Sequence, residues 1–324
     1  MNSMPPISSH SYTDALESVQ YKNGQPLVIF DSQTPFTLTK FELMNESGHA
    51  TYPHHHDFYE ILYITEGEGA HIIDFESYPI NRSSFYFLSK GQVHFWQLTK
   101  PLKGYALLIP EEFLAFPSSN IIRAHDFAFF HNVANKPCLS VNGENQIKLT
   151  TMLEGIEEEL YDEVNPSLSI VRSYLHILLM KLDRLYCAEH MGKHLEQTSS
   201  LLRQFEQLVS EHYISEHSVK DYAQRIGVSP NHLIDTIKAA TGYAPGQIIR
   251  NKIILEAKRL LSHSDLSAAE VGYRLNFEDA SYFGRFFKRE TDMSPTAFRK
   301  QIREKFNISS ASLTRTEKSA RITE

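Results

Sequence analysis

Cysteine is scarce in this chain of 324 residues, which contains only Cys138 and Cys187 and no Cys-x-x-Cys pair. Two cysteines cannot build the disulfide framework of a small secreted domain, so a reducing compartment is expected. The N-terminus lacks the basic start and apolar run of a signal peptide, and the longest largely apolar run, 174–180, stops at Lys181. A membrane helix needs about 20 apolar residues. We therefore expect a cytoplasmic protein that does not enter a membrane.

An overall excess of positive charge is also absent, because the net charge is −7. The charge is unevenly distributed along the chain. Residues 201–303 contain 15 Lys and Arg against 12 Asp and Glu, a net charge of +3, and the rest of the chain has 17 against 27, a net charge of −10. This division indicates that only the C-terminal part approaches a polyanion such as nucleic acid.

The sequence pattern in the first half of the chain is typical of a β domain. Short β-rich runs separated by turn residues lie between residues 27 and 109, and this close spacing is typical of a sandwich or barrel. The glycines of the segment 65–69 are expected to form a tight hairpin connection. We expect a flexible N-terminal arm over residues 1–24 and a β-barrel over 25–140.

Helical periodicity begins after this region. Apolar residues recur at spacings of three and four, which predicts connecting helices over residues 141–195. The stripe could pack on its own domain or form a dimer seam, and the sequence leaves both open. The tail 304–324 lacks periodicity and is expected to be disordered. The stripe comprises Leu168, Val171, Leu175, Leu178, Leu179, Leu182, Leu185 and Tyr186.

The region 200–303 contains two helix-turn-helix patterns. In the first, Ser218 is placed to cap a short helix, Gly227 allows a sharp turn, and Ser229 followed by Pro230 starts a second helix. About fifty residues later the pattern recurs, with Ser267 and Asp279 as the caps. The segment 245–261 is expected to be a helix that connects the two units.

The segment 270–299 closely resembles the signature of the AraC/XylS family of transcription regulators, with its Ser-Tyr-Phe-x-Arg-x-Phe-Lys helix and its Pro-x-x-Phe-Arg close. Two family glycines are replaced, by Asn276 in the second turn and by Asp292 after the second recognition helix. Asn and Asp enter left-handed backbone conformations more readily than other residues with a side chain, so the geometry should survive.

The resemblance implies which residues contact DNA. Asn231, Ile234 and Asp235 from the first unit, and Ala280, Ser281 and Arg285 from the second, would face the major groove. Arg285 is the strongest candidate, since its planar group can bind guanine O6 and N7 together. Family members often have Arg at the position of Asp235, and this carboxylate should repel phosphates. Phosphate contacts that position the protein are expected from Lys238, Lys288 and Arg289.

The N-terminal half carries a second motif, Gly48-x5-His54-x-His56-x3-Glu60-x6-Gly67. This spacing resembles the first motif of cupin barrels. On a strand, His54 and His56 point to one face, and Glu60 returns to that face if the strand is regular. His94 occupies the histidine position of the second cupin motif, in which Ser83 and Ser89 replace a glycine and a proline.

Two uses of these side chains remain open, and a third possibility is that the run His54-His55-His56 lies at a barrel rim and has no specific role. Three imidazoles and one carboxylate can bind a divalent transition metal and support enzyme chemistry. In AraC-type sensors, which the rest of the chain resembles, the barrel instead binds a small effector, generally without metal. The aromatic side chains nearby, including Trp96, would suit the apolar faces of a sugar. The expected effector-binding residues are His54, His56, Glu60, His94 and Trp96.

The sequence therefore predicts an α+β protein of two domains, an N-terminal cupin-like β-barrel followed by connecting helices and an all-α C-terminal domain with two helix-turn-helix units. The predicted function is that of a ligand-responsive, sequence-specific DNA-binding regulator and not an enzyme, with no cofactor. The alternative is a cupin metalloenzyme with His54, His56, Glu60 and His94 as metal ligands. The expected partners are double-stranded DNA, a small-molecule effector and a second copy of the chain, with RNA polymerase as a further candidate.

Overall fold

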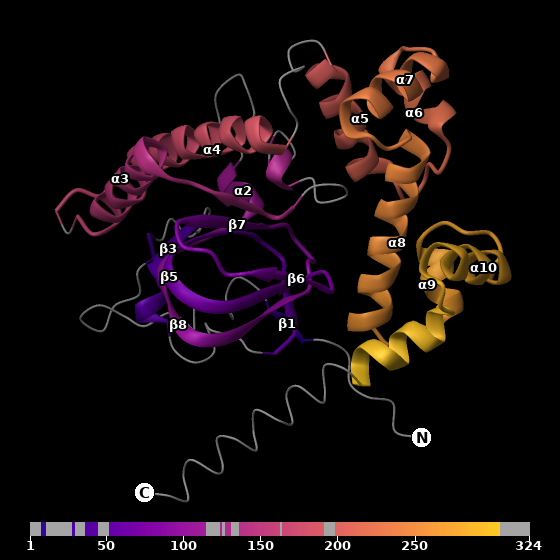
Figure 1. Cartoon of the computed structure of the whole chain (residues 1–324), viewed down its shortest axis with the longest axis horizontal. Helices are drawn as coiled ribbons and strands as arrows, with labels where there is room; N and C mark the ends of the chain where they lie inside the picture. Colours follow the sequence, from indigo (N-terminus) through magenta and orange to yellow (C-terminus); the bar gives the residue numbers. More distant parts are fainter. Residues whose placement is uncertain are drawn as a thin grey trace, which may run out of the picture.

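The computed structural model describes residues 8–10, 28–29, 36–44, 52–114, 124, 127–130, 136–162, 164–190 and 198–304. An N-terminal domain built on a sheet carries two long helices on one side, and a separate all-helical domain follows (Figure 1). The predicted α+β class with two domains is confirmed. Of the expected arm only residues 8–10 are described, and the expected tail lies outside the described residues apart from residue 304.

The described strands form one sheet in the order β1-β4-β8-β5-β7-β9, with β3 on β8, β2 on β3 and β6 on β5. The long strands β5 and β8 pair antiparallel and are strongly curved (Figure 1). The pairing among these strands leaves the sheet open, where a closed barrel was expected. The strands are β1 Ser8–His10, β2 Val28–Ile29, β3 Phe36–Lys40, β4 His54–His56, β5 Tyr59–Ile73, β6 Glu76–Pro79, β7 Ser84–Leu88, β8 His94–Ile109 and β9 Cys138–Ser140.

The prediction of a hairpin connection at residues 65–69 was wrong. Strand β5 continues through this segment, with register shifts between Ile64 and Gly69 against β8. Gly69 has a φ of +139°, and an added Cβ would lie 2.1 Å from the Gln97 carbonyl oxygen. The glycine therefore allows two strands to approach closely at a bulge, rather than reversing the chain.

Helices α3 (Gly143–Leu160) and α4 (Leu168–His190) lie over one face of the sheet (Figure 1). They share a core cluster with residues of β3, β5, β7 and β8. The predicted apolar stripe of α4 is largely buried in this cluster, which supports packing on its own domain. A second face of α4 remains exposed. Short helical segments complete the domain, namely η1 Phe41–Leu43, α2 Glu111–Leu114 and η3 Ala128–Phe130.

The C-terminal domain contains the two predicted helix-turn-helix units, α6–α7 and α9–α10, with α8 between them. Ser229 Oγ accepts a hydrogen bond from the His232 amide at 3.2 Å, and Ser267 forms a capping box with Glu270. No helix in the described part of the chain is both long and apolar enough to span a bilayer. The helices are α5 Thr198–His212, α6 Val219–Ile226, α7 Pro230–Thr241, α8 Pro245–His263, α9 Ala268–Arg274 and α10 Ala280–Thr291.

Three residues with a left-handed backbone conformation lie in the turns of these units. Gly227 ends α6 with a φ of 80°. Asn276, between α9 and α10, has a φ of 61°, and Asp292, after α10, has a φ of 59°. The expectation that Asn and Asp take over the conformations of glycine at these two positions is confirmed.

The two domains meet at α8. Its Arg259 donates to the Asp74 carboxylate through Nε at 3.0 Å and through Nη2 at 2.8 Å, and the Arg259 side chain is buried. Asp74, in the turn after β5, also accepts a hydrogen bond from Gln92 Nε2 at 2.8 Å. Ile72 and Phe95 of the sheet belong to the same apolar cluster as the C-terminal helices. A bidentate pair of this kind fixes orientation as well as distance.

A buried carboxyl group in α5 makes stability depend on pH. Glu206 is 9% exposed, its Oε2 has no hydrogen-bond partner among the described residues, and burial raises its pKa to about 8. Because the folded pKa lies above the ordinary value, the folded state binds more protons, and stability falls as the pH rises between about 4.5 and 8.

We expect the substitution Glu206→Gln to stabilise the protein at pH 8 and to change little at pH 5. The expected difference grows with each pH unit within the interval, because the ionised carboxylate is destabilised by burial only in the folded state. Thermal unfolding of both proteins at the two pH values tests this, with Glu278→Gln, an exposed position, as the matched control. Equal stabilisation at pH 5 and pH 8 would contradict the account.

Candidate DNA-binding surface and histidine pocket

Helix α7 divides into a buried and an exposed face. Leu233 and Ile237 are fully buried in the core of the C-terminal domain. The predicted contact residues are all exposed and recur at spacings of three and four, which places them on one face of the helix. They are Asn231, Ile234, Asp235 and Lys238.

Helix α10 has the same construction. Phe283, Phe286 and Phe287 are buried, as expected for core residues. Gly272 of α9 lies against Phe283, where an added Cβ would be 3.0 Å from the ring, so the glycine lets the two helices approach closely. The predicted contact residues Ser281, Arg285, Lys288 and Arg289 are exposed, and Ala280 is half-buried at the start of the helix.

Charge is distributed unequally between the two exposed faces. On α10, Arg289 donates to the neighbouring Glu290 and also lies over the ring of Phe286. Arg285 and Lys288 extend the positive charge along the same helix. On α7 the exposed face carries Asp235 as well as Lys238, so its charges cancel. Since phosphate attraction depends on net positive charge, α10 is the stronger candidate for anchoring the protein to DNA.

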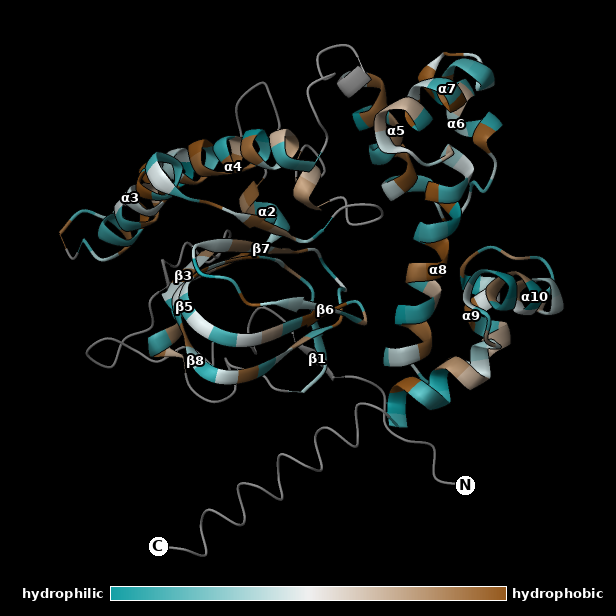
Figure 2. Ribbon diagram, in the orientation of Figure 1, coloured by the Kyte–Doolittle hydropathy of each residue, from teal (hydrophilic) through white to brown (hydrophobic). Residues whose placement is uncertain are grey.

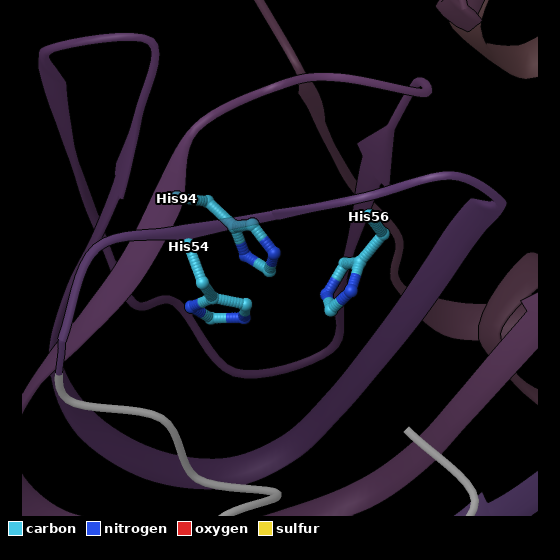
Figure 3. Close-up of side chains that lie close together, drawn as sticks. All are labelled: His54, His56 and His94. Carbon is cyan, nitrogen blue, oxygen red and sulfur yellow. The ribbon is translucent and has the colours of Figure 1, made fainter. Parts of the chain in front are cut away.

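All three predicted histidines converge in the N-terminal domain. The rings of His54, His56 and His94 face one another (Figure 3), with centroids separated by 4.2 Å between His54 and His94 and by 4.8 Å for the other two pairs. One ring nitrogen from each lies within 4.8 Å of the others. Strand β4 supplies the first two, and β8, which pairs with it at His54, supplies the third.

Hydrogen bonds orient two of these rings. His54 donates from Nδ1 to the Tyr52 carbonyl oxygen at 2.9 Å, which leaves its Nε2 lone pair directed elsewhere. His94 Nδ1 lies 3.1 Å from His71 Nε2, and one of these nitrogens donates to the other. His94 Nε2 is buried and has no hydrogen-bond partner among the described residues. The histidine cluster therefore has an unused nitrogen that a bound molecule or ion could engage.

Glu60, at the start of β5, completes the predicted set. It is 8% exposed, and its Oε2 lies 3.9 Å from His56 Nε2. Burial raises the pKa of Glu60 to about 8 and lowers the pKa values of His94 and His71 well below the ordinary value. Near neutral pH these buried groups are uncharged, and they can exchange hydrogen bonds with a polar ligand.

The sequence prediction missed His71, which is fully buried in β5. Its ring stacks on that of predicted Trp96, with centroids 3.7 Å apart. Trp96 is itself 3% exposed, so its buried indole supports the ring of His71 beside the three histidines. Counting alternate positions from Glu60 would not have identified His71, because the register shifts in β5 change which residues face the interior.

Comparison with known proteins matches both halves of the chain. Residues 44–169 match the model of an AraC-like ligand binding domain, and residues 222–301 match that of a helix-turn-helix domain. The HTH-type transcriptional activator RhaS of Citrobacter koseri is 26% identical over 251 residues, which cover 76% of this chain and 86% of that protein.

Two solved structures are also similar. The DNA-binding domain of AdpA, in complex with a target DNA, is 30% identical and covers 32% of this chain and 94% of its own, with a TM-score of 0.30. ToxT from Vibrio cholerae is 17% identical and covers 82% of this chain and 94% of its own, with a TM-score of 0.40. The two domain matches, in this order along the chain, together with the similarity to RhaS, support a regulator and not an enzyme. The chain belongs to the AraC family of transcription regulators.

Proposed function

We propose that α7 and α10 enter successive major grooves of an operator and that an occupant of the histidine pocket controls this binding. The observation that carries the proposal is the pair of exposed helix faces, each opposite a buried apolar face, in two helix-turn-helix units. Recognition helices of this kind bind about one helical turn apart.

The two helices have different roles in this proposal. Arg285 binds a guanine through O6 and N7 and supplies sequence selectivity, while Lys288 and Arg289 bind phosphates. Ala280 and Ser281 lie at the N-terminal end of α10, close to the bases. On α7, Asn231, Ile234 and Asp235 face the bases, and Lys238 contacts phosphate. The carboxylate of Asp235 makes this helix the weaker contributor.

The effector is proposed to be a small polar molecule bound among His54, His56, Glu60 and His94. Uncharged imidazoles and a protonated carboxyl can both donate and accept hydrogen bonds, which suits hydroxyl groups such as those of a sugar. Trp96 contributes by supporting His71 and the pocket wall.

A divalent transition metal is the second candidate occupant. It is favoured by the buried, unused Nε2 of His94 and by the hydrogen bonds that orient His54 and His94, a common arrangement around metal-binding histidines. Ligand nitrogens about 2.0–2.1 Å from an ion lie closer together than 4.8 Å, so the rings would move inward on binding.

A homodimer is proposed through the second face of α4. Four large apolar side chains are 37–51% exposed there, at spacings of three and four residues. A second copy would cover them and present two DNA-binding domains to two half-sites. The four apolar residues on this face of α4 are Ile170, Tyr174, Ile177 and Met180.

RNA polymerase is a proposed further partner, because the matched relatives are named as activators. A cytoplasmic location is proposed because the proposed partner is DNA.

The substitution Arg285→Ala should weaken binding to an operator selected from a random duplex pool by about 1–3 kcal/mol and should reduce selectivity. Lys288→Ala should weaken binding to operator and random duplexes alike. It should also reduce the slope of log K against log salt concentration by about one. Fluorescence anisotropy at several NaCl concentrations measures both effects. Lys148→Ala, on α3, is the control. If Arg285→Ala left selectivity intact, α10 would not be the base-reading helix.

Titration with Co²⁺ tests the metal as occupant. We expect one equivalent to produce the visible absorption of an imidazole-bound ion, and His94→Ala to abolish it. His176→Ala, on α4 outside the cluster, should leave the spectrum unchanged. Absence of the band in the unmodified protein would remove the metal and leave the pocket to a metal-free effector.

The substitution Ile177→Glu should convert the dimer to a monomer, because it places a charge in the proposed apolar interface. Sedimentation velocity over a range of protein concentrations measures this. Ile147→Glu, the same substitution at an exposed position of α3, should leave association unchanged. A dimer that survives Ile177→Glu would place the interface elsewhere.

A further inference from the structure

His71 and His94 form a buried pair at the edge of the histidine cluster. They lie on the neighbouring strands β5 and β8, and His71 Nε2 is 3.1 Å from His94 Nδ1. His71 is 0% exposed and His94 is 2% exposed. An uncharged imidazole carries one N–H and one lone pair. One of the two facing nitrogens therefore holds a proton, and the other accepts the hydrogen bond.

The outer nitrogens of this pair are unsatisfied. His71 Nδ1 and His94 Nε2 are both buried, and neither has a hydrogen-bond partner among the described residues. Leaving a buried polar group unpaired costs about 1–3 kcal/mol, so such a group commonly marks a bound ion, water or ligand. Since His71 occupies Nδ1 of His94, Nε2 is the nitrogen that His94 can offer to the cluster, where its ring faces His54 and His56 (Figure 3).

Aromatic packing holds the ring of His71 in place. His71 pairs in register with Trp96 across β5 and β8, and the two rings stack with centroids 3.7 Å apart and planes 17° apart. The ring of Tyr86 lies 5.6 Å away on another side. The Tyr86 hydroxyl donates to the Pro79 carbonyl oxygen at 2.8 Å. These neighbours fix the plane of the His71 ring, and the proton positions of the pair are set by the two histidines themselves.

Two proton arrangements satisfy this geometry. In the first, His94 Nδ1 donates to His71 Nε2, which leaves a lone pair on His94 Nε2 and places the other proton on His71 Nδ1. In the second, His71 Nε2 donates to His94 Nδ1, which places a proton on His94 Nε2 and a lone pair on His71 Nδ1. Both residues have the same tautomer in either arrangement. A cation can bind His94 only in the first, because a metal ligand must offer a lone pair.

We propose that His71 and His94 are a coupled pair that shares one tautomer, and that a divalent cation bound at the cluster of His54, His56 and His94 holds both members with the proton on Nδ1. His71 is then a positioning residue, because it acts on the cation site through His94 and does not touch the ion. The coupling stands on the geometry of the two buried rings, whereas its effect on a cation rests on the proposed function in which a metal occupies the cluster.

Nitrogen NMR of the full-length protein, with its histidines isotopically labelled, tests the coupling, because protonated and unprotonated ring nitrogens give well-separated signals. The signals are assigned by their loss in His71→Gln and His94→Ala. Without metal at neutral pH, we expect equal fractions of the Nδ1-protonated tautomer in the two residues, and Zn²⁺ should convert both to that tautomer. Opposite tautomers would overturn the coupling. Matching tautomers with no response to Zn²⁺ would uphold the coupling and overturn its effect on a cation, together with the metal as occupant.

Two substitutions separate positioning from packing. His71→Leu removes the acceptor for His94 Nδ1 and should weaken Co²⁺ binding about 10–100-fold. His71→Gln, whose side-chain oxygen can accept the same hydrogen bond, should retain most of the affinity. Tyr86→Phe removes only the hydroxyl that donates to Pro79, so it should bind Co²⁺ normally and controls for disturbance of the core. Fluorescence of Trp96, the only tryptophan, reports on the folding of each variant. Equal losses in the Leu and Gln variants, or no loss in either, would overturn the role of His71.

Discussion

Helix α8 is the element on which both halves of the molecule depend. Seven aliphatic residues along it are buried, and each of the six isoleucines and leucines among them contributes about 1.5–3 kcal/mol if it would otherwise be exposed. Apolar and polar residues alternate along its visible length (Figure 2). Because α8 packs against both helix-turn-helix units, it fixes the separation of α7 and α10. The buried residues are Ile248, Ile249, Ile253, Ile254, Ala257, Leu260 and Leu261.

The same helix connects the DNA-binding domain to the sheet. Asp74, which pairs with Arg259 of α8, also hydrogen-bonds through its backbone amide to the Val93 carbonyl at 2.8 Å, next to His94 of the pocket. A second contact joins β4 to α8, where the ring centroid of His55 lies 4.6 Å from that of His263 at the end of α8. Direct contacts therefore join β4 and the start of β8, which carry the three histidines, to α8. Because desolvation largely offsets the attraction within buried ion pairs in general, we assign this pair mainly the role of fixing which surfaces meet.

The parts of the fold that could be predicted from sequence are those with local causes. Caps such as Ser229 and Ser267 and the turn at Gly227 act within a few residues, so the helix-turn-helix units were found nearly to the residue. The period-two placement of His54 and His56 was likewise local. The continuous β5 and the role of His71 depend on bulges set by a partner strand. The pairing of Asp74 with Arg259 joins residues 185 positions apart, and no local pattern encodes it.

Dimethyl sulfate protection of a selected operator tests the central claim most directly, because the reagent reports on guanine N7 in the major groove. If α8 holds two recognition helices at a fixed spacing, each bound chain should protect guanines in two major-groove segments centred about 10 base pairs apart on one face of the duplex. Protection confined to one segment, or segments on opposite faces of the duplex, would contradict it.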